Sequence, residues 1–491
     1  MRSWKSRSSA PPTSAASWAA RLSVRLSRTY CAADPAGAVL ARRPLRTRSN
    51  RTTTPHPAHS ARSEVKERAL SQLLLGCIAD DFTGGTDLAS MLVRGGMRTL
   101  QVIGVPQGPI PSDVDAVVIA LKTRTLPTEE AVRESVAALE WLRQAGCKQF
   151  FFKYCSTFDS TAEGNIGPVA DAMMDALGID FTLACPAFPE NKRTLYQGHL
   201  FVGDVLLSDS GMRHHPLTPM TDANLVRVLG QQTKREVGLV PYSVVAQGAA
   251  AIREAFDGAR QAGKGYVIVD AIDNANLNVI GEAAADHTLI TGGSGVAIGL
   301  PENFQRAGLL PASQAAAELP KVGGLSVVLS GSCSVATNDQ IEHWQKTRPS
   351  FQLDPLLLAD GRDQVSEALA WAKERIGKEP VLIYGSARPE AVKAAQERLG
   401  VEAAGQLVEE ALSIIAVGLD QMGVRQFVVA GGETSGAVVK ALGVEALLIG
   451  APIDPGVPWT VGVRDVPVAL ALKSGNFGSL DFFEKALGQI Q

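Results

Sequence analysis

Residues 73–87, LLLGCIADDFTGGTD, are the stretch of sequence that decides the fold. An apolar run of strand length ends on two adjacent carboxylates, Asp80 and Asp81, and a glycine-containing turn and a helix-like run at 88–93 follow. Ligands of open α/β sheets bind beyond the carboxyl ends of the strands, so both acids are expected where the chemistry is done. The alternative interpretation is that Asp81 or Thr83 only caps the following helix.

Strand-like runs alternate with amphipathic helices along the rest of the chain. Buried strands are expected at residues 100–105, 116–121, 150–154, 181–185, 266–270, 288–291, 326–330, 381–384, 426–430 and 468–472. Helices are expected between them, for example at 128–145 and 165–177. A stretch rich in proline and glycine at 306–324 interrupts this pattern and predicts a linker. The alternation therefore predicts two α/β domains with mostly parallel sheets, at 71–305 and 325–491.

Charge is distributed unevenly along the 491 residues. Residues 1–63 contain eleven arginines and Lys5 against one acid, Asp34, a formal charge of +11, which leaves −14 for residues 64–491 out of the total of −3. An acidic body argues against a nucleic-acid partner, and no apolar run reaches the length that spans a membrane. Six cysteines without CxxC or cysteine–histidine spacing are typical of reduced thiols, and no metal-binding residues are predicted.

Residues 1–70 are expected to be a disordered basic extension, because their composition, rich in Arg, Ser, Thr and Pro, cannot bury a core. Such a composition is typical of an organelle transit peptide. It is equally typical of upstream sequence translated from a start codon assigned too early. The protein is therefore expected in the cytoplasm, or in an organelle matrix if the extension is a transit peptide.

Three loops of the second unit combine glycines with hydroxyl side chains directly after a predicted strand. Backbone amides can approach an anion at a glycine, and a helix N-terminus adds positive partial charge, so these loops are expected to bind phosphates. They lack the GxxxxGK[ST] pattern, and a tight strand-to-helix turn would require glycine as well. The proline-rich stretch 452–459 is expected to be either a rigid loop that forms a wall of the pocket or an ordinary turn. The candidate nucleotide-binding residues are Ser332, Ser334, Gly431, Gly432, Glu433, Thr434, Ser435 and Gly475.

Four residues of the first unit are candidates for substrate binding. Lys153 ends a predicted strand and precedes a run of hydroxyl side chains around Asp159 and Ser160. This combination suits recognition of a small polyhydroxylated acid, although a surface lysine paired with Asp159 would give the same pattern. Arg193 adds a guanidinium that can hold a carboxylate through two hydrogen bonds, although a single arginine in a loop is usually solvated.

Taken together, these motifs resemble those of the four-carbon acid sugar kinase family, nearest to its members that act on 3-oxo-tetronate. The resemblance runs in unbroken order over residues 72–490. Lys192 departs from the pattern, since it stands where the family usually has glycine. The matching motifs are IADDFTGGTD at 78–87, FKYCSTFDSTAEGNIGP at 152–168, PAFPENKRT at 186–194, FVGDVLLSDSGM at 201–212, HPLTPM at 215–220, VLSGSCS at 328–334, AGGETSG at 430–436, PGVPW at 455–459 and LKSGNFG at 472–478.

The resemblance implies an N-terminal domain that binds a sugar acid, a C-terminal domain that binds ATP with Mg²⁺, and an active-site cleft between them. The implied reaction transfers the γ-phosphoryl group of ATP to the terminal hydroxyl of 3-oxo-tetronate, giving the 4-phosphate. Asp81 would orient or deprotonate that hydroxyl, with Asp80 as the other candidate, while Lys153 and Arg193 would hold the acid. The alternatives are a threonate or erythronate 4-kinase of the same family and a non-catalytic sugar-acid sensor. A homo-oligomer is possible.

Overall fold

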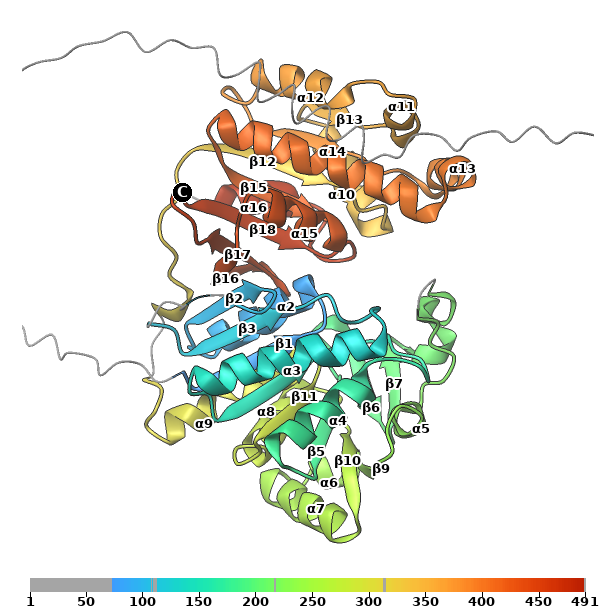
Figure 1. Ribbon diagram of the computed structural model, residues 1–491, viewed down its shortest axis with the longest axis vertical. Coiled ribbons are helices and arrows are strands. Elements are labelled where there is room, and N and C mark those ends of the chain that lie inside the picture. Colours follow the sequence, from blue (N-terminus) through green and yellow to red (C-terminus); the bar gives the residue numbers. More distant parts are fainter. Residues whose placement is uncertain (1–72, 107, 109–112, 216–217, 312–314, 490–491) are drawn as a thin grey trace, which may run out of the picture. The chain divides into compact units, whose positions relative to one another are not determined.

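The structure is a computed structural model that describes residues 73–106, 108, 113–215, 218–311 and 315–489 (Figure 1). The expected disordered extension, residues 1–70, lies outside the described residues. Within them, no helix is both long enough and apolar enough to cross a bilayer. The described chain is α/β, as its sequence predicts.

The first part of the chain forms a parallel arrangement of strands in the order β2-β3-β1-β4-β11-β5-β10-β9. These strands are β1 (Leu75–Ala79), β2 (Thr99–Ile103), β3 (Ala116–Ala120), β4 (Gln149–Lys153), β5 (Thr182–Cys185), β9 (Glu236–Val240), β10 (Lys264–Val269) and β11 (Leu289–Gly292). The α-helices between them are α2 (Phe82–Arg94), α3 (Thr128–Gln144), α4 (Ile166–Leu177), α5 (Leu225–Gly230), α6 (Tyr242–Val245), α7 (Ala249–Gln261), α8 (Asn274–Ala283) and α9 (Pro301–Arg306). A small antiparallel sheet contains β6 (Arg193–Tyr196), β7 (His199–Val202) and β8 (Val205–Leu206).

The second part continues in the order β13-β14-β12-β15-β18-β17-β16. Its strands are β12 (Leu325–Ser330), β13 (Ser350–Gln352), β14 (Val381–Tyr384), β15 (Val424–Ala430), β16 (Ala446–Asp454), β17 (Val457–Gly462) and β18 (Val468–Lys473). Its α-helices are α10 (Val335–Gln345), α11 (Pro355–Ala359), α12 (Gln364–Lys373), α13 (Pro389–Leu399), α14 (Val401–Gln421), α15 (Gly432–Ala441) and α16 (Phe482–Gln489). The pairs β13–β14, β14–β12, β12–β15 and β15–β18 are parallel. In contrast, β17 pairs antiparallel with both β18 and β16.

The two sets of strands form one sheet, because β16 pairs antiparallel with β2 through Ala446–Val102, Leu447–Gln101 and Leu448–Leu100. The sequence pattern does not predict this pairing. Of the two alternatives for residues 452–459, the rigid loop is wrong and the turn is confirmed: these residues end β16, turn at Pro455-Gly456 and begin β17. Gly456 has a φ of +77°, which explains the glycine in this turn.

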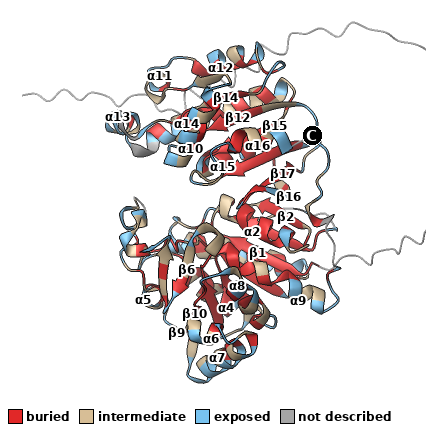
Figure 2. Cartoon of the chain, turned by 180° about the vertical axis from the view of Figure 1, so that it is seen from behind, coloured by how far each residue is buried: buried red, intermediate tan, exposed pale blue. Residues whose placement is uncertain are grey.

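The central strands of the large sheet are buried, its edge strands β9 and β13 are partly exposed, and the helices expose their outer faces (Figure 2). β1 and β3, LGCIA and AVVIA, are buried at every position. Such continuous apolar runs are typical of parallel strands that are covered on both faces. A strand of this kind leaves only its ends open to ligands, and this places the residues that follow β1, β3, β12, β15 and β18 in the candidate site.

Candidate active site

The acid pair lies directly beyond the carboxyl end of β1. The backbone amide of Asp80 donates to the carbonyl of Lys153, and the carbonyl of Asp80 accepts from the amides of Thr123 and Arg124 at 3.0 and 3.2 Å. Asp81 stands at the N-cap position of α2, but its side chain makes no capping hydrogen bond. Instead, its Oδ2 accepts a hydrogen bond from Thr83 Oγ1 at 3.0 Å. A capping role alone does not account for this carboxylate, which also binds Thr83 and Arg124.

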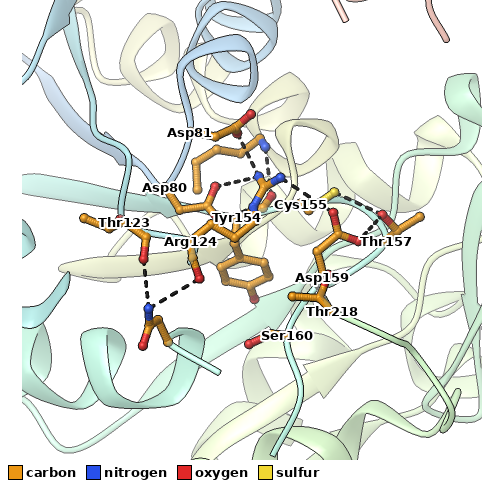
Figure 3. Close-up of polar contacts among 12 residues, drawn as sticks. Asp80, Asp81, Thr123, Arg124, Tyr154, Cys155, Thr157, Asp159, Ser160 and Thr218 are labelled. Atoms are coloured by element: carbon orange, nitrogen blue, oxygen red, sulfur yellow. Dashed lines mark hydrogen bonds and ion pairs between the residues drawn. The ribbon is translucent and has the colours of Figure 1, made fainter. Parts of the chain in front are cut away.

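Arg124 gathers three carboxylates around one guanidinium (Figure 3). It donates to Asp80 through Nε and Nη2, both at 2.9 Å, and to Asp81 Oδ1 through Nη2 at 2.8 Å. Its Nη1 lies 3.6 Å from Asp159 Oδ2. Arg124 was not among the predicted site residues. It follows β3 and so stands at the ligand-binding edge of the sheet. Arg124 fixes the orientation of both acids.

The two adjacent acids differ in burial and in pKa. The Asp80 side chain is 6% exposed and the Asp81 side chain 28%. Burial raises the pKa of Asp80 and outweighs the opposing effect of Arg124. Burial also opposes ionisation of Asp81, but Arg124 and Lys153 outweigh it, so the pKa of Asp81 is lowered. The pKa of Asp81 is therefore the lower of the two, so Asp81 is the more readily ionised member of the pair.

Lys153 ends β4 and faces the first turn of α2. It is buried, and its Nζ donates to the carbonyl of Tyr154 at 2.8 Å. A methyl group placed on Gly84 would lie 3.0 Å from Lys153 Nζ and would collide with Asp81 Oδ1. Glycine at this position therefore lets the ammonium and the carboxylate share the same turn of the helix.

Asp159 and Ser160 are buried and line a small cavity together with Arg124. Thr157 Oγ1 donates to Asp159 Oδ1 at 2.7 Å, and Gln232 Nε2 donates to Ser160 Oγ at 2.9 Å. Both residues line a cavity of about 10 Å³, which is the size of a single water molecule. A four-carbon acid does not fit this cavity. The role of Asp159 and Ser160 in substrate binding stays a prediction.

Arg193 lies in a separate pocket of about 290 Å³. Its Nη1 donates to the carbonyl of Asn191, while its Nε is buried without a hydrogen-bond partner. The pocket also contains Asp454, Asn476 and Phe477 from the second part of the chain. Lys192 precedes Arg193 with a φ of +59°, a backbone conformation that favours glycine. An unpartnered guanidinium nitrogen in a pocket suits a carboxylate ligand.

The three predicted glycine–hydroxyl loops follow β12, β15 and β18 and lie together. Ser334 Oγ donates to the carbonyl of Gly475 at 2.6 Å, and a methyl group on Gly475 would lie 2.5 Å from Ser332 Oγ. A pocket of about 780 Å³ opens beside them. Ser435 is buried in α15 and does not line this pocket. Five of the candidate nucleotide-binding residues do line it: Ser332, Gly431, Gly432, Glu433 and Thr434.

Lys473 is a second residue that our sequence analysis did not select. Its side chain is fully buried, and Nζ donates to Thr337 Oγ1, to the carbonyl of Ser474 and to the carbonyl of Gly475 at 2.9 to 3.1 Å. Burial lowers the pKa of Lys473 to about 7. From its buried position, the Lys473 side chain holds the backbone carbonyls of Ser474 and Gly475 in the loop that follows β18.

The acid pair and the nucleotide pocket meet at α2 and α15. These helices pack together, and a methyl group on Gly432 would lie 3.8 Å from Thr83 Oγ1, the group that donates to Asp81. Beside this contact, Lys122 Nζ donates to Glu433 Oε2 at 2.6 Å. The side chain of Thr83 thus lies between the predicted catalytic acid and the predicted phosphate-binding loop.

Comparisons with known proteins also give a two-domain arrangement. Residues 75–300 match the family model described as a sugar-binding N-terminal domain, and residues 327–483 match the one described as a nucleotide-binding C-terminal domain. A 3-oxo-tetronate kinase of Burkholderia multivorans is 62% identical over 417 residues, which cover 85% of this chain and 97% of that protein. A 3-oxo-tetronate kinase of Haemophilus influenzae is 47% identical, over 84% of this chain and 99% of that protein.

Two crystal structures are similar over the same region. A protein from Salmonella typhimurium LT2 superposes with a TM-score of 0.79 at 44% identity, over 85% of this chain and all of that one. A Haemophilus influenzae protein superposes with a TM-score of 0.72 at 47% identity and the same coverage. With two family models that together span most of the chain, and relatives above 60% identity, the chain belongs to the four-carbon acid sugar kinase family.

Proposed function

We propose that the protein is an ATP-dependent kinase that phosphorylates the terminal (4-) hydroxyl of 3-oxo-tetronate. Residues 71–305 would bind the sugar acid and 325–491 the nucleotide, with 306–324 as the linker. The observation that carries this proposal is the contact between the two half-sites, where Thr83 joins Asp81 to the Gly432 loop. Relatives at 47–63% identity that are named 3-oxo-tetronate kinase support the choice of substrate.

Asp81 is the proposed base. It orients the 4-hydroxyl and accepts its proton as the oxygen attacks the γ-phosphorus of ATP. The new P–O bond forms while the bond from the γ-phosphorus to the β–γ bridging oxygen breaks, and ADP leaves with that electron pair. Phosphoryl transfer depends mainly on positioning and charge neutralisation. The lowered pKa of Asp81 favours the charged carboxylate, which suits it to orient the hydroxyl by a hydrogen bond and to accept the proton only as the P–O bond forms.

The sugar acid is proposed to lie between Asp81 and Arg193, along the first turns of α2. Lys153 Nζ and Arg193 would neutralise its carboxylate, and the unpartnered Arg193 Nε supports this assignment. The pocket around Arg193 is large enough for a four-carbon acid and is lined from both parts of the chain. Asn476 and Phe477 follow Gly475, so the same loop would border the acid on one side and the phosphates on the other.

ATP is proposed to occupy the 780 Å³ pocket with its phosphates at Ser332 and the Gly431-Gly432 turn. Mg²⁺ usually combines one or two protein carboxylates with phosphate oxygens of the substrate. The oxygen donors of Glu433 and Thr434 line the pocket at this place and fit that requirement. They would hold the ion, which would neutralise charge on the phosphates.

A coupled assay of ADP release tests the proposal with 3-oxo-tetronate, threonate and erythronate as acceptors. We expect turnover with 3-oxo-tetronate and a product phosphorylated at the 4-hydroxyl, identified by phosphorus NMR. Turnover with only threonate or erythronate would instead identify one of the other kinases. Binding of an acid without ADP release from any of the three would identify a sensor.

A further inference from the structure

Lys122 brings a positive charge from the sugar-acid region to the mouth of the nucleotide pocket. It follows β3, and its Nζ donates to Glu433 Oε2 at 2.6 Å. Glu433 lies in the first turn of α15 and lines the pocket beside Gly431 and Gly432. The ammonium therefore lies next to the loop proposed to bind phosphates.

The backbone around Lys122 is fixed by hydrogen bonds, whereas its side chain is mostly exposed. The next two amides, of Thr123 and Arg124, donate to the carbonyl of Asp80, and Asn165 Nδ2 donates to the Thr123 carbonyl at 2.8 Å. The Lys122 side chain itself is 73% exposed. Exposed ion pairs contribute little to stability, so the ammonium can exchange Glu433 for another anion at small cost.

The nucleotide pocket lacks the positive charge that a triphosphate requires. Among its lining residues, one is basic, Arg362, and its Nε donates to Glu367 at 3.0 Å. Four of the lining residues are acidic: Asp354, Glu367, Glu409 and Glu433. A polyphosphate in this lining therefore depends on cations from outside it, and Lys122 stands at its edge.

We propose that Lys122 is a catalytic residue whose Nζ leaves Glu433 when ATP binds and donates hydrogen bonds to the γ-phosphoryl group. It transfers no proton, and it stabilises the charge that spreads over the γ-phosphoryl oxygens as the bond to ADP breaks. The same short segment then serves both substrates, since Arg124 fixes the acid pair and Lys122 contacts the phosphoryl group. This inference rests on the proposed kinase function.

The test compares Lys122→Met, Lys122→Arg and a control, Lys148→Met, in the full-length chain. Lys148 is an exposed lysine of the same region that directly precedes β4, at the opposite end of the parallel strands. Affinities for ADP and for a non-hydrolysable ATP analogue, both with Mg²⁺, are measured by calorimetry without any sugar acid. Turnover with 3-oxo-tetronate and circular dichroism complete the comparison.

We expect Lys122→Met to weaken binding of the ATP analogue about tenfold, and binding of ADP by less than about twofold, since ADP lacks the γ-phosphoryl group. We expect its kcat to fall by about 10²- to 10³-fold, the usual effect of removing one such donor. Lys122→Arg should recover part of both losses, and Lys148→Met should match the wild type.

Equal effects on ADP and the ATP analogue, or a normal kcat, would overturn the assignment of Lys122. The binding measurement separates this inference from the proposed function because it needs no acceptor. If Lys122→Met selectively weakens binding of the ATP analogue but no four-carbon acid is phosphorylated, the contact to the γ-phosphoryl group stands and the proposed function fails. If the wild type binds neither nucleotide, both proposals fail.

Discussion

The two halves of the candidate site carry charge in different ways. Around β1, three carboxylates are held by one buried network with Arg124 at its centre, and each has a fixed partner. Around β12, β15 and β18, glycines and hydroxyl groups line an open pocket that contains one paired arginine. Removing one charge destabilises a buried charge network. Adding a side chain at a glycine of a loop blocks the close approach of a ligand to the backbone. Substitutions can therefore tell the two halves apart.

The largest expected effect is that of Asp81→Asn, which keeps the shape of the side chain and removes its charge. General bases contribute about 10²- to 10⁴-fold, so kcat should fall within that range. Affinity for ATP should change little, because the residue belongs to the charge network and not to the pocket. Steady-state kinetics and calorimetry with ATP measure the two quantities. Normal turnover in both this variant and Asp80→Asn would refute a catalytic role for the pair.

Arg124→Met should cause the largest loss of stability. It leaves Asp80, Asp81 and Asp159 without their common partner, and breaking a buried ion pair in this way costs about 3 to 5 kcal/mol. Urea denaturation measures the free energy of unfolding. Arg227→Met serves as the control, because it removes an exposed ion pair with Asp222 in the same part of the chain. Similar small losses in both variants would mean that the network does not hold the acids.

Asp87 should make stability depend on pH between about 4 and 6. Burial raises the pKa of Asp87 to about 6, with its Oδ2 bound by Ser294 and its Oδ1 unpartnered. Because the unfolded chain releases this proton near pH 4, the folded state binds more protons between the two values, and stability falls as the pH rises. By pH 7 the free energy of unfolding should have fallen by about 2 to 3 kcal/mol, because the pKa of Asp87 differs by about two between the folded and the unfolded chain.

The measurement is the free energy of unfolding from pH 4 to 7 for the wild type and Asp87→Asn. The variant lacks the titrating group, so its stability should fall less over this interval. Asp113→Asn, a substitution of an exposed acid, should keep the wild-type dependence. Parallel curves for all three proteins would show that Asp87 does not titrate in this range.

The smallest of these effects is expected for Gly432→Ala in the nucleotide loop. In the free protein, a methyl group at this position meets nothing closer than Thr83 Oγ1 at 3.8 Å, so folding should be unaffected. Beside a bound phosphate the methyl group should raise the KM for ATP about tenfold, equivalent to about 1.4 kcal/mol, without changing affinity for the acid. Gly436→Ala in the same helix is the matched control, since it meets no atom within 4 Å. An equal change in both variants would place the phosphates elsewhere.

The sequence by itself determined the α/β class, most strands and the positions of the acids and glycine loops relative to those strands. Continuous apolar runs identify buried strands, and the residues that follow them lie at the ligand-binding edge of the sheet. The family followed from the order of its motifs and was confirmed by the comparisons.

Only the tertiary structure decided how these local features combine. The pairing of β16 with β2, the three carboxylates around Arg124, and the contact of Lys122 with Glu433 join residues far apart in the chain. Lys122 and Arg124 carry no local pattern that marks them, because lysine and arginine on a loop are usually solvated. Their roles depend on which carboxylates the fold brings within hydrogen-bonding distance, and neither periodicity nor composition contains that distance.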